Sequence, residues 1–204
     1  ETTNKIVKIL AKDKSDIIVF SDFRHGLFNK QTLSKLLEIK NLKNKFLVAD
    51  SQVASRWGCI TDFENFDLVT PNEREARFAL ADQDSTVGRL SQILTDKINC
   101  KNLILKLGSK GVFCKTSIKN SIDSYFSIDS FTNKPIDPVG AGDALLAYSG
   151  LSLYVSKSLV MSSIIGSMAA AVECELDGNI PVKKNQVINK IKEIEKKIQN
   201  NYKY

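Results

Sequence analysis

Two glycines and two carboxylates stand directly before an apolar helical run in the second half of this 204-residue chain. Residues 137–144 read Asp-Pro-Val-Gly-Ala-Gly-Asp-Ala. Gly140 and Gly142 have no Cβ, so a ligand can approach their backbone amides at the start of a helix, where anions bind. Asp143 falls in the first turn, where it would repel a phosphate unless a cation shared the site. A carboxylate beside an anion cradle indicates phosphoryl-transfer chemistry.

This run resembles the signature of the ribokinase-like (PfkB) carbohydrate kinases, which transfer the γ-phosphoryl group of ATP to a sugar hydroxyl. The resemblance implies that Asp143 takes the proton of that hydroxyl. It implies that the backbone at Gly140, Ala141 and Gly142 holds the transferring group, and that Asp137 organises the loop and the surroundings of the metal. The alternative is an ordinary glycine-rich turn with Asp143 as a first-turn helix residue.

Asn72 and Glu75 stand three residues apart, directly after an apolar run at 67–70. Residues at this spacing share a helix face. The Asn-x-x-Glu pattern resembles the family motif associated with Mg²⁺, an ion that prefers oxygen ligands and keeps several waters. The same pair fits a capping box, with Asn72 as the N-cap and Glu75 at the third helical position. Both interpretations can hold together.

Lys106 interrupts an apolar stretch at 102–107, and a Leu-Gly-x-x-Gly turn follows with Gly108 and Gly111. The turn resembles the family's nucleotide-side turn, which implies that Lys106, Gly108 and Gly111 border the nucleotide. Alternatively, the stem of Lys106 packs while its amine reaches solvent.

Gly178 and Asn179 open a Gly-x-x-Pro segment that resembles the family's turn near the adenine. The resemblance implies that the base binds there. A plain helix-to-helix turn ended by Pro181 is the alternative.

Two acidic residues stand where strands are predicted to end. Asp22 closes the apolar run 17–22 and is followed by Arg24, and Asp50 closes the run 46–50. Open α/β sheets bind ligands just beyond the carboxyl ends of their strands. The first segment also resembles the family's Asp-Tyr-x-x-Gly element near phosphate and sugar, so Asp22, Arg24 and Asp50 are candidate substrate residues. A strand-to-helix turn is the alternative for that segment.

Short apolar runs alternate with helical patterns along the chain. Strands are predicted at 17–22, 46–50, 67–70 and 124–131, and residues 102–113 are predicted to form a strand, a glycine turn and a second strand. Helices are predicted at 31–39, from 71–75 through 81, and at 87–98, 144–155, 159–172 and 183–200. This alternation predicts an α/β protein, a three-layer α/β/α domain around a mostly parallel sheet, and the resemblance identifies it as ribokinase-like. One domain is expected over residues 1–204, with a lysine-rich helix at about 183–200.

Charge and cysteine usage narrow the class of protein. The net charge is +6, but residues 183–204 hold seven lysines against two glutamates, so the basic character belongs to the tail. Apolar residues recur there at helical spacing without interleaved aromatic residues, which favours a docked surface helix over a nucleic-acid interface. Four scattered cysteines indicate neither a zinc site nor a disulfide framework. Without a membrane span or signal sequence, the protein is expected to be cytoplasmic.

The resemblance covers nearly the whole chain but leaves out the family's opening third, which carries early strands, the lid and most sugar-selecting residues. No such sequence precedes Glu1, so the chain is expected to be a fragment or a split gene product. Residues 50–52 and 70–77 are most similar to the heptose-phosphate kinases and to the kinase halves of ADP-heptose-forming enzymes.

The expected activity is phosphorylation of a sugar or sugar phosphate with ATP and Mg²⁺, and a heptose phosphate is the narrower candidate. A homodimer is the candidate assembly, and neither a membrane nor a nucleic acid is an expected partner. The alternative is a non-catalytic kinase remnant that serves as a nucleotide-binding or scaffold module. The missing opening third favours this alternative, while intact Asp143, Asn72 and Glu75 argue against it. A third interpretation, nucleic-acid binding through the tail, predicts binding that weakens steeply with salt.

Overall fold

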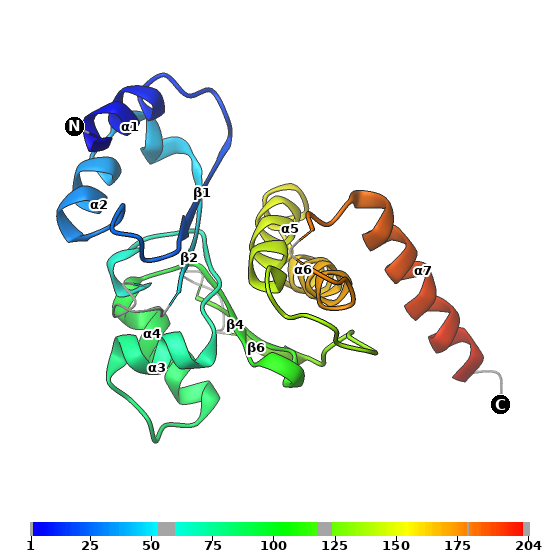
Figure 1. Cartoon of the computed structure of the whole chain (residues 1–204). Helices are drawn as coiled ribbons and strands as arrows, with labels where there is room; N and C mark the ends of the chain where they lie inside the picture. The colour runs from blue at the N-terminus through cyan, green and yellow to red at the C-terminus, as the bar shows by residue number, and fades with distance from the viewer. Residues whose placement is uncertain (1, 53–59, 118–123, 179, 202–204) are drawn as a thin grey trace. The chain divides into compact units, whose positions relative to one another are not determined.

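The computed structural model describes residues 2–52, 60–117, 124–178 and 180–201 (Figure 1). The strands are β1 (Ile17–Asp22), β2 (Phe46–Ser51), β3 (Leu68–Val69), β4 (Asn102–Lys106), β5 (Val112–Thr116) and β6 (Ser124–Ile128). The α-helices are α1 (Thr2–Leu10), α2 (Lys30–Leu37), α3 (Glu73–Leu80), α4 (Val87–Ile98), α5 (Ala141–Ser156), α6 (Leu159–Cys174) and α7 (Lys184–Asn201). Short 3₁₀ helices lie at η1 (Lys40–Asn44), η2 (Ile60–Asp62) and η3 (Gly108–Lys110). None of the helices in the described ranges is long and apolar enough to cross a membrane.

The chain divides into two compact units. Unit 1 comprises Glu1–Gly108 and Val112–Ser127, and unit 2 comprises Ser109–Gly111 and Ile128–Tyr204. Unit 1 therefore contains helices α1 to α4 and almost the whole sheet, and unit 2 contains α5, α6 and α7. That the chain forms one domain stays a prediction.

The strands form one mixed sheet in the order β1-β2-β3-β4-β5-β6. Strands β1 to β4 are parallel, and β5 is antiparallel to β4. The register places Ser21 beside Asp50 and Asp22 beside Ser51, so β1 and β2 end in neighbouring polar residues. The α/β class with a mostly parallel sheet is confirmed.

The core of unit 1 lies between the sheet and its helices. Parallel strands that succeed one another across a sheet take right-handed crossovers, which carry the connecting helices to the same face. The buried cluster includes Phe20, Ala49, Val69, Leu103 and Leu105 from the strands and Leu33, Leu36, Leu90, Leu94 and Ile98 from α2 and α4. Burial of these side chains away from water makes the main favourable contribution to the folding free energy of unit 1, and it holds the strand ends, and thus the candidate site, in place.

Unit 2 is built on the close packing of α5 and α6. Gly166 of α6 permits this approach, because a Cβ there would lie 2.9 Å from the Cβ of Ser149 on α5. Helix α7 docks on the same unit, where Val187 is buried and the amine of Lys190 lies 2.8 Å and 3.0 Å from the two carboxylate oxygens of Glu175. The lysine-rich tail thus forms a docked helix.

Candidate active site

The carboxyl ends of β1 and β2 hold a buried polar cluster. Asp22 is 3% exposed, and its Oδ2 accepts a hydrogen bond of 2.8 Å from the hydroxyl of Ser51. The same oxygen lies 3.0 Å from Nη1 of Arg24, and Oδ1 accepts the backbone amide of Arg24 at 2.9 Å. Arg24 has a φ of +60°, in the left-handed region that non-glycine residues rarely adopt. Asp22 therefore uses both oxygens to fix Arg24 and the end of β2.

A second buried pair joins two strands that are separated by β3. Asp50 of β2 is 4% exposed, and its Oδ2 lies 2.6 Å from Nζ of Lys106 at the end of β4. The backbone amide of Lys106 donates to the carbonyl oxygen of Pro71 at 2.9 Å, directly before the start of α3. The interpretation in which the amine of Lys106 reaches solvent is wrong, because the amine is paired and the side chain is 16% exposed.

Asn72 and Glu75 form the capping box of α3. Oδ1 of Asn72 accepts the amide of Glu75 at 2.8 Å, and Oε2 of Glu75 accepts the amide of Asn72 at 2.6 Å. The capping interpretation is confirmed. Within the described ranges, no three His, Cys, Asp or Glu side chains are placed to hold a metal ion together. Asn72 and Glu75 supply oxygen atoms, the ligand type that Mg²⁺ prefers, and their role as Mg²⁺ ligands stays a prediction.

Asn72, Lys106 and Gly108 line one cavity of unit 1, which has a volume of about 870 Å³. Arg74 also lines the cavity, and its guanidinium lies 5.5 Å from the ring centroid of Phe78. Gly108 has a φ of +62°, and no atom lies within 4 Å of where its Cβ would be, so a ligand has room to approach the backbone. This cationic lining fits an anionic ligand such as a nucleotide phosphate.

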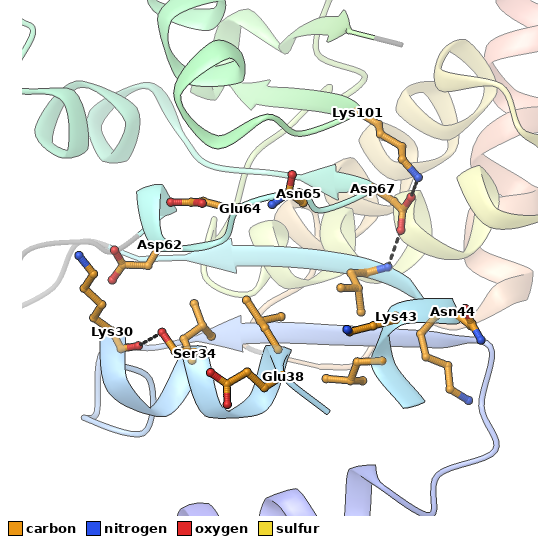
Figure 2. Close-up of a pocket in the computed structure, with 15 residues that line it drawn as sticks. Lys30, Ser34, Glu38, Lys43, Asn44, Asp62, Glu64, Asn65, Asp67 and Lys101 are labelled. Carbon is orange, nitrogen blue, oxygen red and sulfur yellow. Dashed lines mark hydrogen bonds and ion pairs between the residues drawn. The ribbon is translucent and has the colours of Figure 1, made fainter. Parts of the chain in front are cut away.

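A second cavity of about 830 Å³ lies at the amino-terminal ends of β2 and β3, and Figure 2 shows its lining. Asp67 there accepts the amide of Leu47 at 2.8 Å and the amine of Lys101 at 2.6 Å. The lining carries four lysines and four acidic residues, so it has no net charge to attract a phosphate. None of the predicted site residues lines it, and we do not assign the active site to it.

The signature in unit 2 is shaped by backbone contacts. The carbonyl oxygen of Cys174 accepts the amides of Ile136 at 2.7 Å and Asp137 at 3.2 Å, and Oδ1 of Asp137 accepts the amide of Val139 at 2.9 Å. Gly140 is the N-cap of α5, with a φ of +88° that favours glycine and no side-chain cap. The first amides of a helix have no partner within the helix, so this end can receive an anion.

Ala141, Gly142 and Asp143 occupy the first turn of α5, as the signature predicted. Asp143 is the acidic residue of that turn. The structure thus brings the predicted base and the predicted anion-binding backbone to one helix start. Their roles in catalysis stay predictions.

Gly111 and Gly178, the remaining glycines predicted at the site, have different surroundings. Gly111 has a φ of +84°, and a Cβ there would lie 2.0 Å from the carbonyl oxygen of Ile128. This close packing alone accounts for a glycine at that position. Gly178 also has a φ of +84° but has open space around it. Asn179 lies outside the described residues, and a nucleotide contact at any of these positions stays a prediction.

Sequence reasoning missed one residue of this region. Glu173, near the end of α6, is 2% exposed, and both of its carboxylate oxygens are buried without a hydrogen-bond partner in the described part of the chain. Burial raises the pKa of its carboxyl, and the nearby Asp137 and Asp143 raise it further, while the Ile180 amide lowers it. The available signal was a charged residue at the end of an otherwise apolar helix.

The predicted residues thus fall into two sets, one in each unit. Unit 1 brings together Asp22 with Arg24, Asp50 with Lys106, and Asn72 with Glu75 and Gly108. Unit 2 brings together Asp137, Gly140, Ala141, Gly142 and Asp143, and also contains Gly111 and Gly178.

The sequence matches a family model described as pfkB family carbohydrate kinase over residues 3–184. It is 25% identical to the bifunctional protein HldE of Campylobacter fetus over 161 residues, which is 77% of this chain and 33% of that protein. It is 22% identical to the HldE of Desulfatibacillum aliphaticivorans over 161 residues, or 77% of this chain and 31% of that protein. The chain spans about a third of the length of these relatives.

The fold is similar to those of solved kinases. The phosphofructokinase-2 of Escherichia coli aligns with a TM-score of 0.79 at 17% identity, over 95% of this chain and 62% of that chain. The ribokinase of Arabidopsis thaliana, solved with ribose and ATP, aligns with a TM-score of 0.71 at 18% identity, over 93% of this chain and 59% of that chain. The ribokinase-like fold is therefore confirmed.

Proposed function

This chain belongs to the pfkB family of carbohydrate kinases, and we propose that it transfers the γ-phosphoryl group of ATP to a hydroxyl of a sugar or sugar phosphate. The observation that carries this proposal is the start of α5, where Gly140 turns the backbone and Asp143 stands in the first turn. An anion-binding helix start with an adjacent base is what phosphoryl transfer requires.

In this mechanism the sugar hydroxyl attacks the γ-phosphorus, the bond to the β-phosphate oxygen breaks, and ADP leaves. Asp143 accepts the hydroxyl proton as the new bond forms. The amides of Ala141 and Gly142 would donate to the oxygens of the transferring group, where negative charge is concentrated. The Ala141 amide would do so in place of its 3.3 Å hydrogen bond to the carbonyl oxygen of Pro138. The anchoring of the loop on Cys174 fixes these donors before the substrate arrives.

Asn72 and Glu75 would hold Mg²⁺, which neutralises phosphate charge when it is bound. Their capping box fixes both side chains at the start of α3, so they are preorganised for this role. The adjacent cavity with Lys106, Gly108 and Arg74 would take nucleotide phosphates. Asp22, Arg24 and Asp50 are the candidates for sugar contact.

A heptose phosphate is the first acceptor to test, because this chain is similar to the HldE proteins and resembles the heptose-phosphate kinases. A non-catalytic nucleotide-binding or scaffold module is the second candidate.

A transfer assay with ATP, Mg²⁺ and a panel of sugars and sugar phosphates tests the proposal. Asp143→Asn cannot accept the proton, so its turnover is expected to fall at least about a hundredfold while its affinity for ATP is retained. Asp177→Asn makes the same change at an exposed position and is expected to behave as wild type. Equal turnover in wild type and Asp143→Asn would remove the base assignment. ATP binding without transfer to any acceptor would favour the second candidate.

A further inference from the structure

Glu173 is a buried carboxylate that forms no hydrogen bond or ion pair with the described residues. It lies one residue before the end of α6, is 2% exposed, and has no hydrogen bond to Oε1 or Oε2 in the part of the chain that the structure describes. Buried polar side chains are nearly always hydrogen-bonded, and a buried charge is normally paired. A proton, a cation or a donor must therefore compensate this group.

The signature loop is built against the same end of α6. Cys174, the residue after Glu173, holds the loop through its carbonyl oxygen, which accepts the amides of Ile136 at 2.7 Å and Asp137 at 3.2 Å. A change of charge or position at Glu173 therefore reaches the loop through one intervening residue.

The charges that act on Glu173 are negative. Burial is the largest effect that raises the pKa of its carboxyl, and Asp137 in the loop and Asp143 on α5 raise it further. The nearby backbone amide of Ile180 lowers the pKa, although it makes no hydrogen bond of ordinary length and angle to Oε1 or Oε2. On α6 itself, the Cys174 thiol adds no charge at neutral pH, because burial raises its pKa as well.

Lys190, which α7 places near this end of α6, already pairs with other carboxylates. Lys190 of α7 contacts both carboxylate oxygens of Glu175, at 2.8 Å and 3.0 Å, and lies 3.7 Å from Glu193. Within the described ranges, no ion pair forms at Glu173, and no three His, Cys, Asp or Glu side chains are placed to hold a metal ion. Burial and the two nearby aspartates favour a proton as the neutralising group, and a bound cation is the alternative that the experiment below must separate from it.

We propose that Glu173 is a proton-linked positioning residue of the phosphoryl-transfer site. With its proton bound, Glu173 adds no charge beside Asp137 and Asp143, and the loop accepts an anionic phosphate. When the proton leaves to solvent, a third carboxylate repels the phosphate and weakens its binding. This proposal rests on the proposed function, because it concerns the same anion site.

Proton linkage gives the proposal a direct readout. If the protonated form binds ATP more tightly, binding must draw protons onto Glu173. Calorimetric titrations of ATP into the full chain, in two buffers of different ionisation enthalpy, measure the number of protons taken up. We expect net uptake, and a dissociation constant that rises with pH by up to about tenfold per pH unit, the limit for one linked proton.

Glu173→Gln keeps the size of the side chain and removes its ionisation. We expect this variant to keep its ATP affinity at high pH and to lose the additional proton uptake, whereas protonation of ATP itself contributes equally to both proteins. Glu195→Gln makes the same change at an exposed position of α7 and is expected to behave as wild type. A residue with only a structural role would shift affinity without changing its dependence on pH.

Equal pH slopes and equal proton uptake in wild type and Glu173→Gln, with ATP bound by both, would overturn the role of Glu173 and leave the kinase function standing. An alkali or divalent cation that raises the Tm of the wild type but not of Glu173→Gln would also overturn it, in favour of a bound cation. A folded wild-type chain that binds no ATP would contradict the proposed function itself. If Glu173→Gln does not fold, a ¹³C NMR titration of the wild-type Glu173 carboxyl decides: a pKa that rises on addition of ATP supports the proposal, and an unchanged pKa contradicts it.

Discussion

Unit 1 and unit 2 hold their candidate site residues in different ways. In unit 1, Asp22, Asp50 and Glu75 are each fixed by specific hydrogen bonds or an ion pair. In unit 2, the signature depends on the left-handed backbone of Gly140, and Glu173 is buried without a hydrogen-bond partner among the described residues. The first set is held by paired side chains, so substitutions there should reduce stability. The second set depends on backbone conformation and on the balance of charges. Substitutions there should therefore change stability by straining the backbone or by altering its dependence on pH.

Breaking the buried pair in unit 1 should have the largest effect. Lys106→Met removes the ion pair of the buried Asp50, which is expected to lower the free energy of unfolding by about 3 kcal/mol. Chemical denaturation followed by circular dichroism measures this change. Lys97→Met removes an exposed lysine of the same unit and should alter stability by less than about 0.5 kcal/mol. Equal effects of the two substitutions would show that the pair does not stabilise unit 1.

The backbone of unit 2 can be tested at Gly140. Gly140→Ala forces a side chain into a φ of +88°, and the expected loss is about 2 kcal/mol. Gly88→Ala is the matched control, because that glycine lies inside α4 and its Cβ would make only an ordinary contact of 3.9 Å. This control is expected to leave stability unchanged or raised by up to about 1 kcal/mol. If thermal unfolding ranks the two variants the other way, the conformation assigned to Gly140 is wrong.

The capping box should show an intermediate effect. Asn72→Ala removes the acceptor for the Glu75 amide, which is expected to reduce stability by about 1 kcal/mol. Asn72→Asp keeps an oxygen at the cap and should stay close to wild type. Denaturant midpoints of the three proteins measure the difference. Equal losses in both variants would indicate that Asn72 acts other than as a cap.

Glu173→Gln should give the smallest change in stability, and it should raise the free energy of unfolding rather than lower it. Because the carboxyl pKa of Glu173 is raised on folding, the wild type loses stability as pH rises from the unfolded value of about 4.3 toward the raised folded value. The variant does not titrate, so it should equal the wild type at low pH and exceed it at pH 7 by on the order of 0.5 kcal/mol. Thermal unfolding across this pH range measures the difference. A difference that is the same at every pH would contradict titration of Glu173.

Local patterns in the sequence predicted most of the elements. Helix α4 was predicted at 87–98 from its amphipathic pattern, and it has these bounds, with Leu90, Leu94 and Ile98 buried in the core. Helix α5 begins at Ala141 rather than at residue 144, because the small residues of the signature give no apolar periodicity. The strand ends and the first-turn position of Asp143 followed from the same local patterns.

Contacts between distant residues could not be predicted in this way. Asp50 and Lys106 were each candidates, but their pairing across 56 residues depends on the order of β2, β3 and β4 in the sheet. Glu173 gave no signal beyond a charge at a helix end, because burial and the absence of a partner are properties of tertiary packing. The one clue for Lys106 was a cation inside an apolar strand.

In the proposed function, the start of α5 binds the phosphates of ATP for transfer. Calorimetric titration of ATP into the folded chain, with and without Mg²⁺, tests it most directly. We expect micromolar binding that depends on Mg²⁺ and that survives in Asp143→Asn. The absence of ATP binding in a sample shown to be folded by circular dichroism would contradict it.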